Sequence, residues 1–154
     1  MDLLRGHQVL LNKNILYLLK QNTNKMKTNA DLLNLVQALN ANVGESKTKG
    51  QKKLVKIGER IQKYLDDFNE KKEELRLDAA SVDKDGNLIT NEKGEYSFNK
   101  EGVKKLNKQL KDLLLTNIDF APIPVINPEG LEMYVFLDGW VNGVEFKKLD
   151  EIEL

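Results

Sequence analysis

Cysteine is absent from this chain of 154 residues, and histidine occurs once, as His7. The lack of thiols excludes disulfides, thiolate metal sites and cysteine nucleophiles, and a single histidine excludes sites built from two. No apolar run has the length of a membrane span, and the first five residues do not begin a signal-peptide pattern. We therefore expect a cytoplasmic protein with no membrane association.

Motifs for catalysis are also missing. The chain has no glycine-rich loop followed by Lys-Ser/Thr and no GxSxG turn, which excludes the P-loop and the nucleophile elbow. The carboxylate pairs Asp66-Asp67 and Glu73-Glu74 fall in a predicted helix, where adjacent side chains point about 100° apart and do not converge on one atom. We expect a protein that is not an enzyme and that holds neither a metal nor a cofactor.

Charge is distributed unevenly although the net charge is zero. Residues 1–63 contain 12 Lys/Arg and 4 Asp/Glu, whereas residues 64–154 contain 12 and 20. This asymmetry has two explanations, an ionic partner or mutual neutralisation of two halves that pack together. The segment from Asp112 onward has nine acidic and two basic residues, which fits either an ordinary acidic tail or a mimic of a phosphate backbone.

Residues 1–45 are predicted to form short N-terminal helices. The segments 15–20 (ILYLLK) and 32–37 (LLNLVQ) share an apolar pattern typical of amphipathic helices. Thr28 and Asp31 have the spacing of a capping box, and "HQVLL" at 7–11 has the composition of a short strand. The polar segment 40–50 is predicted to be a loop.

Two longer helices are predicted at 51–79 and 99–115. Heptad-spaced apolar residues give the first a narrow seam, and the second has one apolar stripe. The residues are Leu54, Ile57, Ile61, Tyr64, Phe68 and Leu75 in the first helix and Val103, Leu106, Leu110 and Leu113 in the second. Matching seams joined by about twenty residues predict an antiparallel helical hairpin. Whether this seam closes within one chain or between two stays open.

The connection between these helices, "SVDKDGNLITNEKGEYSF" at 81–98, has three interpretations. With Gly86 at position 6 it matches part of a calcium-binding EF-hand loop, but position 1 is Ser81, which has no carboxylate, and position 9 is Ile89, which has no side-chain oxygen. A disordered connector is the second interpretation. The turn dipeptides Asp85-Gly86 and Lys93-Gly94 favour the third, one or two small β-hairpins with an apolar side resting on the helix ends. The apolar side would consist of Val82, Leu88, Ile89, Tyr96 and Phe98.

The last third, 117–146, is predicted to be extended. Prolines and alternation favour an extended start, and the aromatic segment 131–146 with its Asp-Gly and Asn-Gly turns predicts a β-hairpin or meander. The fold class is therefore α+β in a single domain, 1–154. It is mainly helical, with a helical hairpin, a β-excursion at its turn and a C-terminal β segment.

Two groups of residues are candidates for partner binding. Lysines at the start of the first long helix have the charge to contact phosphates, but no interleaved aromatic or arginine supports base stacking, so a protein partner is favoured over nucleic acid. Aromatic residues near the C-terminus fit core packing, or an interface anchor if Trp140 lies at an exposed turn. The candidates are Lys49, Lys52, Lys53, Lys56, Tyr134, Phe136 and Trp140.

The order of these segments along the chain resembles the layout of a known family. "TNADLLNLVQALNA", a long charged helix ending in "DDFNEKKEEL", "DKDGNLITNEKGEYSF", "NKEGVKKLNKQLKDLL" and "IDFAPIPV" follow one another over residues 28–126. This layout resembles a family of small proteins of unknown function encoded by phages and prophages of low-GC bacteria. The resemblance implies a phage origin and an accessory protein without enzyme activity.

From these features we expect a protein that binds a host protein, such as a component of host defence, and inhibits or modulates it in the cytoplasm of an infected cell. The alternative is a virion component, or a component or chaperone of tail or head assembly, in which the helical seam self-associates. A homo-oligomer is compatible with either function.

Overall fold

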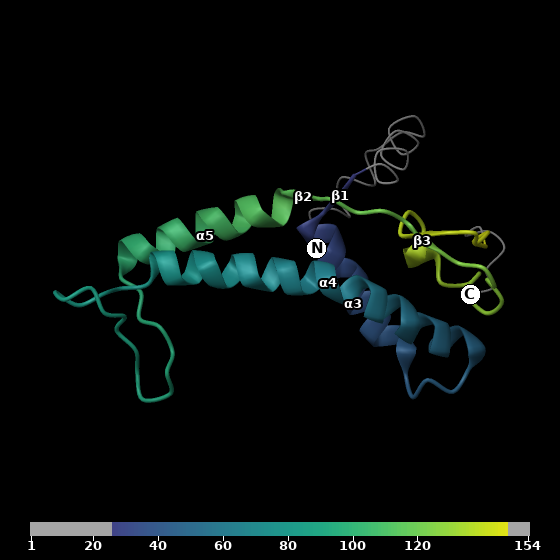
Figure 1. Ribbon diagram of the computed structural model, residues 1–154, viewed down its shortest axis with the longest axis horizontal. Helices are drawn as coiled ribbons and strands as arrows, with labels where there is room; N and C mark the ends of the chain where they lie inside the picture. Colours follow the sequence, from purple (N-terminus) through teal and green to yellow (C-terminus); the bar gives the residue numbers. More distant parts are fainter. Residues whose placement is uncertain (1–25, 148–154) are drawn as a thin grey trace, which may run out of the picture.

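The computed structural model describes residues 26–147, which form helices and very short strands (Figure 1). Within this range the helices are α3 (Asn29–Val43), α4 (Lys49–Ala79) and α5 (Lys100–Leu115). Two pairs of two-residue strands join distant segments, so the α+β class is confirmed. His7, the strand predicted at 7–11 and the helix predicted at 15–20 lie outside the described residues.

Helix α3 begins as the sequence predicts. The Thr28 hydroxyl accepts a hydrogen bond from the Asp31 N–H at 3.2 Å, and the Asp31 carboxylate accepts one from the Thr28 N–H at 2.9 Å. This capping box satisfies two N–H groups that the first turn of a helix leaves without partners. The helix continues to Val43, so the first part of the predicted 40–50 loop is helical and a short turn leads to α4.

Helix α4 is the longest element of residues 26–147 and buries four of its six predicted seam residues, while Tyr64 and Leu75 are half-buried. A second capping box, between Thr48 and Gln51, sets its start. Leu54, Ile57, Ile61 and Phe68 are buried along one face, in agreement with the heptad pattern. Figure 1 shows that α4 runs the length of the molecule, so that it contributes to both ends.

Helix α5 returns antiparallel to α4 and packs against it, as predicted (Figure 1). The stripe that faces α4 differs from the prediction at its start. Val103 is 44% exposed, and Gly102 is buried in its place because its missing Cβ lets α5 approach the carbonyl of Ala79. Gln109, between Leu106 and Leu113 on the same side, places its side-chain oxygen in the interface without a hydrogen-bond partner.

Short strands and one asparagine join the ends of the helices. Strand β1 (Lys27–Thr28) pairs antiparallel with β2 (Asn117–Ile118), which directly follows α5. Asn29 is buried beside this pair, where its side-chain amide donates to the Leu113 carbonyl at 2.8 Å and its backbone N–H donates to Thr116. These contacts hold the start of α3 against the end of α5.

The C-terminal segment is not the predicted hairpin or meander. Strand β3 (Ile123–Pro124) pairs parallel with β4 (Val141–Asn142), and between them lies the 3₁₀ helix η1 (Val135–Leu137). Four backbone N–H groups in succession, those of residues 131, 134, 137 and 140, each donate a hydrogen bond to the carbonyl of the residue three positions earlier. Side chains spaced by three residues align in such turns, so Leu131, Leu137 and Trp140 are buried together.

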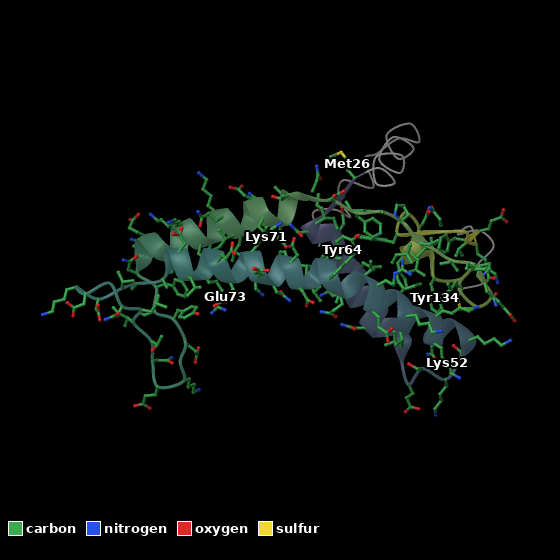
Figure 2. All side chains as sticks on the ribbon, viewed as in Figure 1. Met26, Lys52, Tyr64, Lys71, Glu73 and Tyr134 are labelled. Atoms are coloured by element: carbon green, nitrogen blue, oxygen red, sulfur yellow. The ribbon has the colours of Figure 1, made fainter. Side chains whose placement is uncertain are left out.

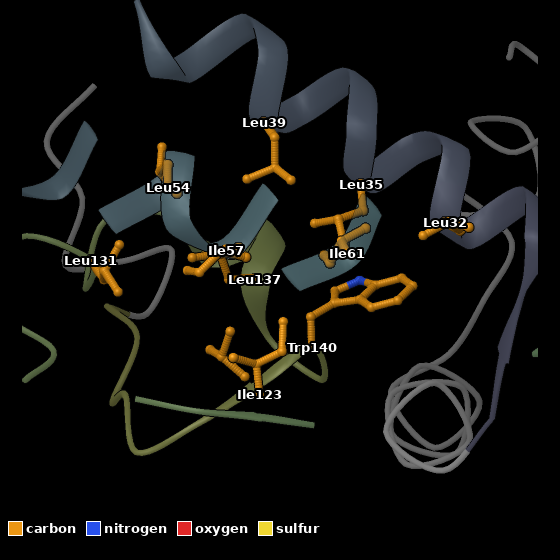
Figure 3. Packing of buried hydrophobic residues seen from close by; sticks show 11 residues of the cluster. Leu32, Leu35, Leu39, Leu54, Ile57, Ile61, Ile123, Leu131, Leu137 and Trp140 are labelled. Atoms are coloured by element: carbon orange, nitrogen blue, oxygen red, sulfur yellow. The ribbon is translucent and has the colours of Figure 1, made fainter. Parts of the chain in front are cut away.

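The hydrophobic core occupies one end of the molecule. Figure 3 shows Leu32, Leu35 and Leu39 of α3 on one side of α4 and the C-terminal residues, including Ile123 and Trp140, on the other. The other end is an arm, which we define as the second half of α4 together with α5. Among residues 26–147 this arm has two helices and no third layer, so it buries less apolar surface than the core.

The connection 81–98 forms two consecutive small turns at the end of the arm (Figure 1). Asp83 and Asn91 have equivalent roles, since each side-chain oxygen accepts hydrogen bonds from the N–H groups two and four residues later. Isolated bridges join Val82 to Leu88 and Thr90 to Tyr96, as the hairpin interpretation requires. Gly86 and Gly94 have positive φ in these turns, where glycine is favoured.

The excursion rests on the arm through fewer side chains than predicted. Tyr96 and Phe98 are partly buried, and the Tyr96 hydroxyl donates to the Glu73 carboxylate at 2.7 Å. This hydrogen bond raises the pKa of Tyr96 above its ordinary value. Val82, Leu88 and Ile89 are exposed, contrary to the prediction that they lie against the helix ends, because no other element of the described part of the chain covers them.

Candidate functional site

A groove of about 360 Å³ lies between the first half of α4 and the segment that contains β3. We name it the basic groove because its charged side chains are cationic and none of its lining residues is acidic. It is lined by Lys53, Lys56, Ile57, Arg60, Ile123, Pro124, Val125, Ile126, Asn127 and Leu131. The groove thus combines an apolar surface with a row of positive charges.

Helix α4 supplies the cations. Lys53, Lys56, Ile57 and Arg60 are separated by three, four and seven positions, which places them on one face over two turns. Ile57 is buried and forms apolar floor, whereas Lys56 and Arg60 are exposed at the rim. An exposed cation above an apolar floor suits a ligand that has both a negative charge and an apolar group.

The opposite wall cannot accept an added β-strand. The N–H groups of Ile123 and Val125 already donate to the carbonyls of Trp140 and Asn142, at 3.0 and 2.8 Å. Their neighbours Pro122 and Pro124 have no N–H, so the free edge of β3 lacks donors at these positions. A ligand in the groove would therefore be held by side-chain contacts, above all with Ile126, which is 99% exposed.

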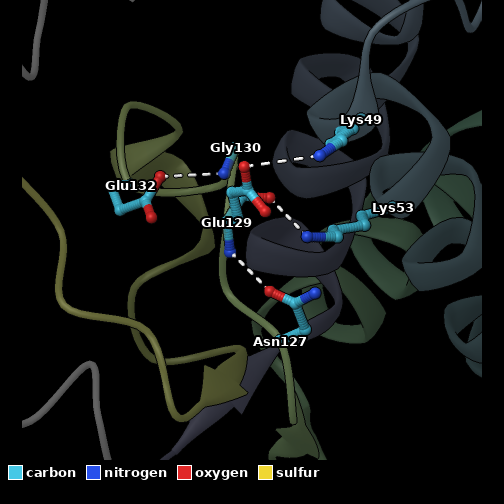
Figure 4. A network of polar contacts seen from close by, with 6 residues as sticks. All are labelled: Lys49, Lys53, Asn127, Glu129, Gly130 and Glu132. Atoms are coloured by element: carbon cyan, nitrogen blue, oxygen red, sulfur yellow. Dashed lines mark hydrogen bonds and ion pairs between the residues drawn. The ribbon is translucent and has the colours of Figure 1, made fainter.

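A loop at residues 127–132, which includes the groove-lining residues Asn127 and Leu131, is fastened to α4 (Figure 4). The Lys49 ammonium lies 3.5 Å from the Glu129 carboxylate, and the Lys53 ammonium donates to the Glu129 carbonyl. Gly130 has φ of 89° and touches the backbone of Gly50, an approach that a Cβ on either residue would prevent. The loop therefore holds Leu131 in place as part of the apolar lining.

The four predicted lysines have different positions. Lys53 and Lys56 line the basic groove, and Lys49 contacts the loop at its end. Lys52 is exposed and does not line the groove (Figure 2). The sequence prediction missed Arg60, although its spacing of seven from Lys53 and four from Lys56 indicates the same helix face.

The aromatic candidates are not gathered in the groove. Trp140 is 4% exposed, so the condition for an interface anchor, an exposed turn, is not met, and core packing is the interpretation that applies to this residue. Its indole packs edge-on against Phe120 with ring centres 4.8 Å apart, and Lys27 lies over it. Tyr134 and Phe136 are half-buried and pack on each other with ring centres 5.9 Å apart.

Lys27 is a buried cation that the sequence did not reveal. It is 7% exposed, and its ammonium is 5.0 Å from the centre of the Trp140 ring. Burial lowers the pKa of Lys27, while the negative charges of Asp31 and Asp138 act in the opposite direction. The lysine fixes β1 over the core, but it is too enclosed to take part in the groove.

A second cavity, of about 740 Å³, lies where the arm meets the core. Its lining includes the cations Lys63 and Lys71 and the anions Asp67 and Asp119, and Lys71 pairs with Asp67 at 3.0 Å. These charges compensate one another, so this cavity lacks the single sign of charge that distinguishes the basic groove.

The calcium interpretation of 81–98 does not agree with the observed turns. One Asp83 carboxylate oxygen accepts the backbone N–H groups of Asp85 and Asn87, at 2.9 Å each, and the residues after Gly86 form a second turn rather than the helix that follows an EF-hand loop. Residues 26–147 contain no cluster of three acidic, histidine or cysteine side chains with the geometry to hold a metal ion.

Comparisons with known proteins place no further constraint on this site. No family model matches the chain, and neither the curated proteins nor the solved structures gave a match. The resemblance to phage-encoded proteins therefore stays a prediction from the sequence. Within residues 26–147, no helix combines the length and the apolar composition that a membrane span requires.

Proposed function

We propose that this protein is a non-enzymatic accessory protein of phage or prophage origin that binds a host protein and inhibits or modulates it. Host defence machinery is the class of partner that we expect, and the cytoplasm of the infected cell is the compartment. The observation that supports binding most directly is the basic groove, where Lys53, Lys56 and Arg60 border an apolar lining with no acidic residue.

The groove indicates the chemistry of the partner. A segment with carboxylate side chains would pair with Lys56 and Arg60, and apolar side chains of the same segment would cover Ile126 and the floor around Ile57. The blocked edge of β3 disfavours strand addition, so the segment would be recognised through its side chains. Phosphate groups would satisfy the cations but would leave the apolar lining exposed, which favours a protein over nucleic acid.

The test is affinity capture from a lysate of a low-GC bacterial host with three versions of the chain. We expect the wild type and Lys52→Glu to retain the same partner in stoichiometric amounts, and Lys56→Glu/Arg60→Glu to lose it. Lys52→Glu is the matched control because it reverses a charge on α4 outside the groove. Equal capture by all three proteins, or no stoichiometric partner at all, would contradict the proposal.

A second candidate is a component of the virion or of its assembly. The exposed apolar residues Val82, Leu88 and Ile89 at the end of the arm favour it, since such a cluster suits contact with another subunit. This function predicts that the protein is present in purified virions and that its mass in solution rises with concentration. A constant monomer mass, together with absence from virions, would remove this candidate.

A further inference from the structure

We infer that the acidic end of the chain, residues 149–154, docks in the basic groove and occupies it until a partner displaces it. The segment reads Leu-Asp-Glu-Ile-Glu-Leu, so three carboxylates are interspersed with three large apolar side chains. The groove offers the complementary set, with Lys53, Lys56 and Arg60 beside Ile126 and Leu131. The charges are therefore opposite in sign, and Lys56 and Arg60 are the exposed cations of the groove.

The course of the described chain brings this segment to the groove. After β4 the chain continues beside β3, where Gly143 touches the Val125 backbone, and the N–H of Lys147 donates to the Glu132 carbonyl at 3.0 Å. Glu132 directly follows Leu131, which lines the groove. The last described residue is thus anchored one position away from the groove lining.

The remaining length is sufficient to span the groove. An extended chain advances about 3.3 Å per residue, so the seven residues from 148 to 154 reach roughly 23 Å. The cationic face of α4 from residue 53 to 60 covers about 10 Å at the helical rise of 1.5 Å per residue. Because prolines block the edge of β3, the segment would bind through ion pairs and apolar contacts, and added salt would weaken it.

The contact between residues 149–154 and the groove can form in the isolated protein. Its effect on partner binding rests on the proposed function. If the groove binds an acidic and apolar segment of a partner, the chain's own end competes for the same cations. Neutralising the end would then strengthen partner binding. A failure of the intramolecular contact leaves the partner proposal standing, because the experiment below uses the isolated protein.

The absence of cysteine allows the contact to be measured with a single spin label. A nitroxide on Leu154→Cys should enhance the relaxation of amide protons at Ile57, Arg60 and Ile126 more than that of amides in α5. The enhancement at the groove should be lost in a Lys56→Glu/Arg60→Glu background and kept in a Lys52→Glu background. High salt should also abolish it.

A second variant tests the same contact from the other side. Asp150→Asn/Glu151→Gln/Glu153→Gln removes the charges of the end without changing the groove, and we expect it to shift the amide resonances of residues 56–60 and 125–127 in the unlabelled protein. Relaxation enhancement that is no greater at the groove than in α5, or that persists after charge reversal of the groove, would overturn the inference. Unchanged groove resonances in the neutralised variant would overturn it equally.

Discussion

Individual positions show how closely the core end of the molecule is packed. Two glycines of α4 differ in the space beside them. A Cβ on Gly50 would overlap the carbonyl of Gly130 and lie 3.1 Å from the Tyr134 ring. A Cβ on Gly58 would meet no atom of the described chain within 4 Å. Gly50 is therefore required by the close approach of the loop at residues 127–132. Gly58 is merely tolerated in the helix.

Gly50→Ala and Gly58→Ala should consequently change stability in opposite directions. We expect Gly50→Ala to lower the free energy of unfolding by about 1–3 kcal/mol through overpacking. Gly58→Ala should raise it by about 0.5–1 kcal/mol because alanine is the better helix former. Urea denaturation of both variants measures this, and destabilisation of similar size in both would contradict the packing described for Gly50.

The buried lysine gives stability a dependence on pH. The pKa of Lys27 is lowered in the folded protein from an ordinary value of 10.5, so the burial penalty is present at neutral pH. Between the two pKa values the unfolded chain binds more protons than the folded protein, and the free energy of unfolding therefore rises with pH in that window. The penalty is gone above 10.5.

Lys27→Met replaces the lysine with an apolar side chain of similar length and so removes the titrating group. The variant should be more stable than the wild type at neutral pH, and this advantage should shrink as pH rises toward 10.5, where Lys27 is neutral in both states. Denaturation of both proteins over a pH series is the measurement. An advantage that grows with pH would show that the sign of the Lys27 contribution is wrong.

Secondary-structure elements differ in how firmly they are held. The excursion 81–98 is joined to α4 by the bond between Tyr96 and Glu73, and its own backbone bonds link residues 81, 89 and 97. Tyr96→Phe should speed hydrogen exchange at the Ile89 and Ser97 amides while leaving the urea midpoint of the protein unchanged. Lys93→Ala, at an exposed turn, is the control, and equal exchange in all three proteins would indicate that Tyr96 does not hold the excursion.

The interface between α4 and α5 contains a polar atom without a partner. A buried acceptor that lacks a hydrogen bond costs about 1–3 kcal/mol, so Gln109→Leu should raise the free energy of unfolding by about 1 kcal/mol. Gln62→Leu makes the same substitution at an exposed position of α4 and should have little effect. A loss of stability in Gln109→Leu would mean that the amide contributes a contact that the interface needs.

The helical part of the fold could be predicted from the sequence because its signals are local. Capping at Thr28, the heptad spacing from Leu54 and the turn dipeptide at Gly86 are all set within a few residues. The C-terminal segment could not be predicted, because its aromatic residues suggest alternation every two positions, whereas the chain winds in turns of three and buries Trp140. Whether the segment forms strands or turns of three depends on its packing against α4 and β3, which are distant in the sequence.

The candidate site was predicted only in part, because some of its residues carry local signals and others are brought in by contacts between distant segments. Lys53 and Lys56 belong to a run of lysines that the sequence displays openly. The spacing of Arg60 from Lys53 and Lys56 is a local signal that was missed. Ile126 joins Arg60 in the groove lining only because the segment of β3 lies beside α4, which nothing local to either segment indicates. Lys52 is adjacent in sequence to Lys53, but helix geometry turns it away from the groove.

The two surfaces proposed for binding, one basic and one apolar, lie at opposite ends of the molecule. The core end carries the basic groove, whereas the end of the arm carries the exposed apolar residues of the excursion. Figure 1 shows β3 and the connection between α4 and α5 at opposite ends of the molecule. Helix α4 belongs to both ends and holds them apart. The two proposed functions therefore use different ends of the molecule, and the position of a bound partner distinguishes them.

Hydrogen exchange of the protein with and without its captured host partner is the most direct test of groove binding. We predict that the partner slows exchange at residues 53–60 and 125–127 and leaves residues 81–98 unchanged. Slower exchange confined to the excursion, with the groove unaffected, would contradict the account and would favour assembly through the end of the arm.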